Sequence, residues 1–187
     1  MAVEEAAAEA GVVAAVETAS IALPCFDSAQ CPGMVHRGVL VYTFQSFPAI
    51  EDLQKLGFEP FVFGALHISL RRFCEVIEQE RPAVVLGLAR SRSTQLEASA
   101  INRFHGPKMV LRDGPQKLAL HTPSDLPTKL KVAKSPSDSF CNWTAYRLAA
   151  FAKKQNPGFK LMFAHVSPKW LNPIVELAAK EASLLST

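Results

Sequence analysis

Three side chains of the kind used in nucleophilic catalysis lie just past stretches that are typical of β-strands. Cys141 stands between a predicted strand over residues 129–133 and a predicted helix over about residues 140–154. His165 closes a second strand-like run, and Glu97 lies in a polar segment that follows a third. The positive end of a helix dipole favours the thiolate, which is the reactive form of cysteine. A nucleophile, a base and an orienting carboxylate in these places predict a cysteine hydrolase.

Each of these residues alone also has an ordinary structural explanation. Cys141 shares a helical face with apolar residues, as small core cysteines do. A histidine at a strand end is commonly satisfied by a backbone carbonyl, and a single glutamate is commonly a solvated surface group. Cys74, between Leu70 and Ile77 on a predicted buried stripe, is better explained as core. Spacing alone therefore leaves the catalytic and the structural interpretations open.

The elements that position these side chains alternate between strand and helix from Gly38 onward. This alternation predicts an α/β sandwich with a mostly parallel central sheet. In open sheets of this type, ligands bind outside the carboxyl ends of the strands, so we expect segments 44–48, 88–97, 135–141 and 165–168 to converge. Strands are expected at residues 39–44, 60–63, 82–88, 129–133 and 160–165, and helices at 66–77, 140–154 and 175–185, with residues 102–128 mostly loop.

Four short motifs fall in or beside these segments. They are TFQSFP at 43–48, EASAIN at 97–102, SPSDSFCNW at 135–143 and FAHVSP at 163–168. In this order they resemble pyroglutamyl peptidase I (pyrrolidone-carboxylate peptidase), a family of cysteine exopeptidases that remove an N-terminal pyroglutamate. The family's motifs read GFEPFG, ERVAIN, SAGTFVCN and Phe-x-His-Val/Ile-Pro. The resemblance covers about residues 38–185 and implies a three-layer α/β/α sandwich of the phosphorylase/hydrolase-like kind.

The resemblance also implies a role for each catalytic candidate. Cys141 would attack the carbonyl carbon of the pyroglutamyl peptide bond and form a thioester acyl-enzyme. His165 would act first as base and then as acid to the leaving amine, while Glu97 orients the imidazole. Backbone N–H groups at the start of the Cys141 helix would stabilise the oxyanion. The expected substrates are peptides with an N-terminal pyroglutamate, and neither a cofactor nor a metal ion is expected.

The substrate-binding candidates match the family less closely. Phe44 and Phe47 match the two aromatic residues that flank the lactam ring, although core packing explains both equally well without the resemblance. Arg92 matches the family's arginine, but GLARSR at 87–92 stands where the family has GQAGGR, so both glycines are lost. Two alternatives follow: a catalytically weak or inactive relative that binds peptides or partners, and a cysteine amidohydrolase for another small acyl group.

Composition argues against several other classes of protein. The 187 residues are 49% hydrophobic and 20% charged, which predicts a domain with a substantial core. The net charge is only +3, with Lys and Arg spread along the chain, so nucleic-acid binding is not expected. No apolar stretch approaches the roughly 18 residues that span a bilayer, so no membrane association is expected.

Residues 1–36 differ from the rest of the chain, and we expect them to form an N-terminal extension ahead of a pyroglutamyl-peptidase-like domain at 37–187. Their Ala-rich start lacks the basic segment of a signal peptide, and four cysteines without dense spacing are typical of reduced proteins. A cytoplasmic location is therefore expected. Cys25, Cys31 and His36 are too loosely spaced to predict a zinc site. The resemblance further implies a homo-oligomer, since relatives of this type commonly form tetramers.

Overall fold

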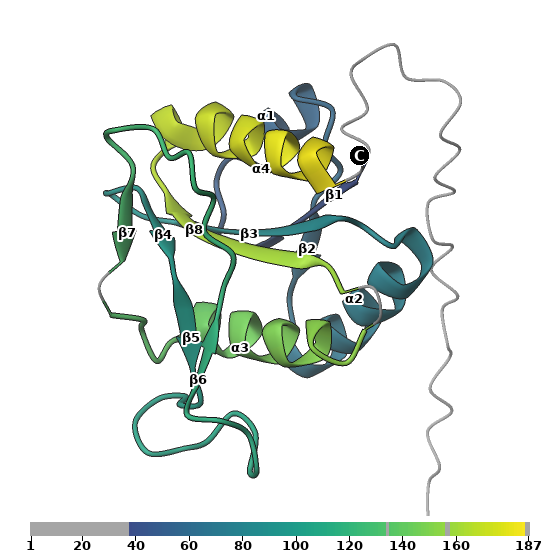
Figure 1. Ribbon diagram of the computed structural model, residues 1–187, viewed down its shortest axis with the longest axis vertical. Coiled ribbons are helices and arrows are strands. Elements are labelled where there is room, and N and C mark those ends of the chain that lie inside the picture. The colour runs from purple at the N-terminus through teal and green to yellow at the C-terminus, as the bar shows by residue number, and fades with distance from the viewer. Residues whose placement is uncertain (1–37, 134, 156–157, 186–187) are drawn as a thin grey trace, which may run out of the picture. The chain divides into compact units, whose positions relative to one another are not determined.

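The computed structural model describes residues 38–133, 135–155 and 158–185, so the expected N-terminal extension and the cysteines in it lie outside the described residues. Over the described residues, a six-stranded sheet lies between two layers of helices (Figure 1). The predicted three-layer α/β fold is confirmed. The elements are β1 (Val39–Phe44), α1 (Ile50–Lys55), β2 (Phe61–Phe63), α2 (Leu66–Glu80), β3 (Val84–Arg90), β4 (Gln95–Glu97), β5 (Ser99–Ile101), β6 (Lys117–Ala119), β7 (Lys131–Ala133), α3 (Phe140–Ala152), β8 (Lys160–Val166), the 3-10 turn η1 (Pro168–Trp170) and α4 (Leu171–Leu185).

The main sheet is parallel over four of its strands and changes direction once. Its strand order is β2-β1-β3-β8-β4-β7, in which β2, β1, β3 and β8 run parallel. β4 runs antiparallel to β8, and β7 runs parallel to β4. β5 and β6 form a separate antiparallel pair. The short elements α1, β4 and β5 were not predicted.

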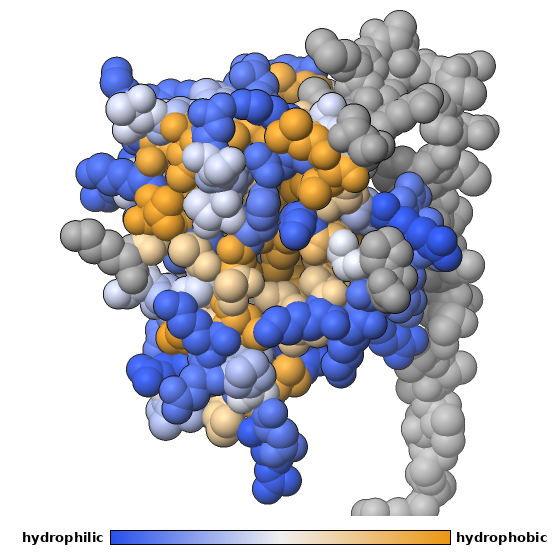
Figure 2. Space-filling model, viewed as in Figure 1, coloured by the Kyte–Doolittle hydropathy of each residue, from blue (hydrophilic) through white to orange (hydrophobic). Residues whose placement is uncertain are grey.

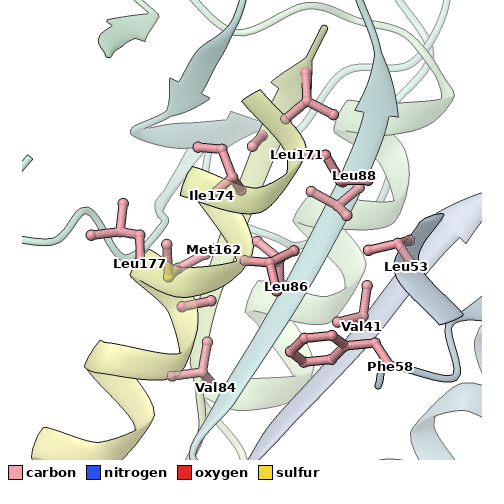
Figure 3. Close-up of a cluster of buried hydrophobic side chains, with 14 of the residues drawn as sticks. Val41, Leu53, Phe58, Val84, Leu86, Leu88, Met162, Leu171, Ile174 and Leu177 are labelled. Carbon is pink, nitrogen blue, oxygen red and sulfur yellow. The ribbon is translucent and has the colours of Figure 1, made fainter. Parts of the chain in front are cut away.

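Apolar side chains on one face of the main sheet pack against α1 and α4. Val41, Leu86 and Met162 come from three neighbouring strands and meet Leu53 of α1 and Ile174 of α4 (Figure 3). All five side chains are almost fully buried. Burial of an aliphatic side chain of this size contributes about 1.5–3 kcal/mol, so this cluster stabilises the layer strongly.

The opposite face of the sheet packs against α2 and α3 and carries the candidate site. Tyr42 of β1 and Phe163 of β8 lie on this face, where Phe73 and Ile77 of α2 cover them. The spacing of the α2 residues is the helical spacing seen in the sequence, so the predicted helix is confirmed there. Figure 2 shows hydrophilic and apolar side chains mixed over the α4 layer, and apolar side chains exposed in the band between the two helix layers. None of the helices in the described part of the chain is both long and apolar enough to cross a membrane.

Gly87 allows two large aromatic rings to meet on the α2/α3 face. It lies on β3 between Tyr42 of β1 and Phe163 of β8, which are its partners in the sheet register. A Cβ at this position would overlap the Cζ and hydroxyl of Tyr42 and lie 2.5 Å from Cδ2 of Phe163. Both rings are almost fully buried and cannot move aside. Glycine is therefore required here by the close approach of its neighbours.

Replacing Gly87 by alanine is expected to destabilise the fold by about 3 kcal/mol, at the upper end for overpacking, because neither ring can shift. Chemical denaturation followed by circular dichroism measures the change. Gly64→Ala is the matched control, since a Cβ there would meet only the side-chain end of Gln45. A Gly87→Ala protein as stable as the wild type would show that the rings are not fixed.

Candidate active site

The first turn of α3 holds Cys141 at a helix N-terminus, as predicted. Cys141 is the second residue of the helix. Ser139, which directly precedes the helix, has an extended backbone, with φ −81° and ψ −178°. No side chain caps this helix start, and no acidic residue lies in its first turn. The positive end of the helix dipole is therefore not neutralised locally, which favours an anion at Cys141.

Asn142 fixes the start of α3 against β5. Its side-chain Oδ1 accepts a hydrogen bond from the Ile101 N–H at 2.8 Å. Its Nδ2 donates to the Ile101 carbonyl at 2.9 Å and to the Arg103 carbonyl at 2.8 Å. Asn142 is buried, so these three bonds satisfy an amide that has little access to water. No role was predicted for Asn142, although its place directly after Cys141 in the motif was a signal.

His165 and Glu97 meet across the antiparallel step of the sheet. Gln95 of β4 pairs with His165 of β8, and Leu96 pairs with Ala164. Glu97 is two residues beyond Gln95, so it lies diagonally from His165 on the same face. Its Oε1 is 3.0 Å from His165 Nδ1. Both side chains are largely buried, with 18% and 8% of their surface exposed.

His165 and Cys141 line the same pocket, and the neighbours of the His165 imidazole change its acidity. Burial tends to lower the pKa of His165, but hydrogen bonds with Cys141 and Glu97 and the negative charges on both raise it from 6.5 to about 9. Because Nδ1 faces Glu97, Nε2 is the nitrogen left for the sulfur. The three residues can therefore form a chain in which a protonated imidazole lies between a thiolate and a carboxylate.

A narrow pocket of about 10 Å³, which is about the space of one water molecule, lies beside these residues. It lies between α3, β5 and β8, and much of its lining is apolar. A larger group next to the sulfur would require this pocket to widen. The lining residues are Glu97, Ser99, Ala100, Leu120, Pro136, Ser137, Cys141, Asn142, Ala145, Phe163 and His165.

Several solved structures of pyroglutamyl (pyrrolidone carboxyl) peptidases share this fold. Pyroglutamyl peptidase I from Bacillus amyloliquefaciens has a TM-score of 0.61 and 18% identity, over 78% of this chain and 94% of that chain. Pyrrolidone carboxyl peptidase from Thermococcus litoralis has a TM-score of 0.60 and 16% identity, over 78% and 92% of the two chains. The chain has the pyroglutamyl peptidase fold. The Thermus thermophilus enzyme gives a TM-score of 0.54 and 19% identity, over 79% and 98%.

Similarity to the pyroglutamyl peptidase fold is found in three dimensions only. No protein-family model matches the sequence, and no curated protein matches it. The aligned parts cover more than three quarters of the chain, but sequence identity over them is below 20%. These similarities therefore show a shared fold. The backbone is therefore retained although most side chains differ.

The predicted substrate-binding residues lie apart from the pocket. Phe44 belongs to the α2/α3 face, where its ring centroid is 6.2 Å from that of Tyr42 and 6.0 Å from that of Phe63. Phe47 is buried in the cluster on the opposite face of the sheet. Arg92 is exposed in the connection between β3 and β4. None of the three lines the pocket, and their part in substrate binding stays a prediction.

Aromatic rings beside Cys141 form a feature that was not predicted. The Phe140 side chain is 51% exposed, and its ring centroid lies 5.4 Å from that of Phe104 and 4.9 Å from that of His105. The loop carrying these partners is tied to the segment before Cys141, because the His105 and Gly106 N–H groups donate to Asp138. The sequence analysis assigned residues 102–128 mostly to loop. The three aromatic residues in or near that loop were the signal in the sequence for this group of rings.

Metal binding finds no support in the part of the chain that is described. No group of three His, Cys, Asp or Glu side chains there is arranged to hold a metal ion. Cys25, Cys31 and His36 lie outside the described residues. The pocket residues that could interact with a ligand are those that supply a thiolate, an imidazole and backbone N–H groups.

Replacing Glu97 by Gln is expected to lower the pKa of His165 from about 9, because the carboxylate charge that raises it is removed. Cys141→Ser is expected to lower it as well, for the same reason. NMR titration of the His165 imidazole measures both effects. A wild-type midpoint at or below 6.5 would mean that burial outweighs the two partners.

Replacing Asn142 by Leu is expected to destabilise the fold by about 2–3 kcal/mol, because the backbone groups of Ile101 and Arg103 lose their partners. It should also slow alkylation of Cys141, since the first turn of α3 is no longer fixed. Asn172→Leu, at an exposed position of α4, is the control and should change neither. Unchanged stability in Asn142→Leu would show that water replaces the amide.

Proposed function

We propose that the protein is a cysteine peptidase that hydrolyses the N-terminal pyroglutamyl peptide bond. The observation that carries this proposal is that Cys141 lines one pocket with the hydrogen-bonded pair of His165 and Glu97, on the pyroglutamyl peptidase fold. These residues reproduce the nucleophile, base and orienting group that thiol hydrolysis requires. The three residues are far apart in the sequence, so their convergence beside a pocket supports a chemical role over core packing.

The proposed reaction begins with the Cys141 thiolate. Its sulfur attacks the carbonyl carbon of the pyroglutamyl amide, and backbone N–H groups at the start of α3 stabilise the oxyanion. His165 then donates its proton to the leaving amine as the carbon–nitrogen bond breaks, which leaves a thioester on Cys141. A pKa of about 9 means that His165 carries this proton at neutral pH.

The second half of the proposed reaction returns the enzyme to its starting state. His165, now neutral, accepts a proton from a water molecule whose oxygen attacks the thioester carbon. The carbon–sulfur bond breaks, pyroglutamate leaves, and the thiolate and imidazolium re-form. Glu97 holds Nδ1 of the ring throughout, so that Nε2 faces the reacting atoms.

The pocket supports a small, uncharged acyl group as the substrate. Ala100, Ala145, Leu120 and Phe163 supply apolar walls, and a flat lactam ring carries no charge that would need a partner. In the same proposal, Phe44, Phe47 and Arg92 bind the substrate, which requires it to extend beyond the pocket or their segments to move, since none of the three lines the pocket. Phe44→Ala and Arg92→Ala test these roles through KM and kcat separately.

The proposal extends to the setting of the enzyme. We expect it to act without a cofactor on peptides that begin with pyroglutamate, in the cytoplasm and as a homo-oligomer. The solved relatives are described as peptidases, which supports the peptide substrate. Size-exclusion chromatography with light scattering determines the assembly.

The wild type is expected to release the amine from a chromogenic pyroglutamyl amide, and Cys141→Ala to lose at least about 1,000-fold of this activity, because the nucleophile is removed. Cys74→Ala is the matched control and should remain active. Burial and then the charge of Glu78 raise the pKa of Cys74 to about 11, so that thiol stays unreactive at neutral pH. The activity of the Glu97→Gln protein on the same amide should be about tenfold lower than that of the wild type, or lower still.

The same assay separates the proposed activity from the alternatives. Absence of turnover in the wild type would overturn the peptidase proposal. If Cys141 is then alkylated rapidly by iodoacetamide, an amidohydrolase for another small acyl group is favoured. If Cys141 is also unreactive, an inactive relative that binds peptides or partners is favoured.

A further inference from the structure

Leu120, in the segment that follows β6, lines two different pockets. The first is the narrow pocket of about 10 Å³ that Cys141 and His165 also line. The second has a volume of about 300 Å³ and is therefore far larger. Among the described residues, Leu120 alone lines both, and it is only 7% exposed. The residues that line the second pocket are Ala119, Leu120, His121, Ala149, Ala152, Lys153, Phe159, Lys160 and Leu161.

The two pockets follow one another along α3 and β8. On α3, Cys141 lines the first pocket and Ala149 lines the second, at a spacing that keeps both on one face of the helix. On β8, His165 lines the first pocket and Leu161 the second, and this even spacing directs both to one face of the sheet. These spacings correspond to about 12 Å along the helix and about 13 Å along the strand. The second pocket is therefore the space into which the first would widen away from the sulfur.

Hydrogen bonds hold the backbone on both sides of the Leu120 side chain. The Leu120 N–H donates to the Ala98 carbonyl at 3.0 Å, and the His121 N–H donates to the Leu161 carbonyl of β8 at 2.7 Å. The His121 imidazole is also bound, since its Nε2 lies 2.6 Å from Glu181 Oε2 of α4. Moving Leu120 aside would break these contacts, so its side chain is a fixed part of the wall between the two pockets.

We propose that Leu120 determines the length of the acyl group that Cys141 can accept. A short acyl group needs only the first pocket to widen slightly, whereas a long apolar chain must pass through the space that the Leu120 side chain fills. Beyond it, Phe159 and Leu161 are buried apolar residues that would suit such a chain. This inference deepens the proposed peptidase function and rests on it for its biological meaning. It makes Leu120 a residue that determines specificity for small acyl groups.

Acylation of Cys141 by p-nitrophenyl esters tests the proposal without requiring hydrolysis of an amide. The thiolate attacks the ester carbonyl carbon, the bond from that carbon to the phenolic oxygen breaks, p-nitrophenolate leaves, and a thioester remains on the sulfur. Rates with the acetate and the octanoate are each divided by the rate with glutathione, which removes the intrinsic reactivity of the ester. Mass spectrometry of the acylated peptide separates Cys141 from the other cysteines. The wild type should react with the octanoate at least about tenfold more slowly than with the acetate.

Leu120→Ala is expected to raise the octanoate rate by about tenfold or more and to change the acetate rate by less than about threefold, because the two pockets then join. Leu118→Ala is the matched control. Leu118 is a 1% exposed leucine of β6 in the same apolar cluster, and it lines neither pocket. Its replacement should destabilise the fold similarly and leave the ratio of the two rates unchanged. If circular dichroism shows that Leu120→Ala does not fold, the smaller truncation Leu120→Val should shift the ratio in the same direction.

Each remaining outcome decides against one proposal or both. Equal rates with the two esters in the wild type, an unchanged ratio in the folded Leu120 variant, or an equal shift in Leu118→Ala would overturn the role of Leu120. If the ratio shifts as expected but pyroglutamyl amides are not hydrolysed, only the proposed function fails. If the amides are hydrolysed and the ratio does not shift, only the inference about Leu120 fails. A wild-type Cys141 that neither ester acylates would overturn both.

Discussion

The hydrogen bond between the His165 imidazole and the Glu97 carboxylate is the contact on which the rest of the site depends. A buried carboxylate is costly unless a partner compensates its charge. Glu97 Oε2 has no partner among the described residues, so the compensation comes through Oε1 and His165. The contact exists because β4 runs antiparallel to β8, which places the two side chains diagonally on one face. The change of strand direction at β4 therefore brings the Glu97 carboxylate to the His165 imidazole.

The segment from Glu97 to Ile101 connects the base to the nucleophile. Glu97 at its start binds His165, and the backbone of Ile101 at its end binds Asn142, the residue after Cys141. A shift of this short segment would move the imidazole and the sulfur relative to each other. Because hydrogen bonds hold both ends, the geometry of the site does not rely on apolar packing alone. The same segment lines the pocket, so in the proposed reaction it would support both acyl-group binding and the chemistry.

The sequence was sufficient for the layers and for the placement of Cys141 and His165 at the ends of their elements, and the reasons are physical. Cys141 and His165 lie at the ends of long elements whose periodicity is clear, so their positions were predictable. Glu97 was expected in a polar segment, but it ends a strand of three residues and is buried. Its burial depends on pairing with β8, which no local pattern reveals. The role of Asn142 likewise depends on contacts with residues about 40 positions away in the sequence.

Phe44 and Phe47 illustrate the limit of matching motifs. Both aromatic positions are kept in the sequence, yet the chain turns after β1, and the two side chains belong to clusters on opposite faces of the sheet. The aromatic ring that lines the pocket is that of Phe163, which comes from β8 and lies two residues before His165. A strand directs alternate side chains to the same face, so Phe163 and His165 must point the same way. The strand that carries His165 therefore also supplies an apolar wall of the pocket, so one element positions both the proposed base and the proposed contact with the acyl group.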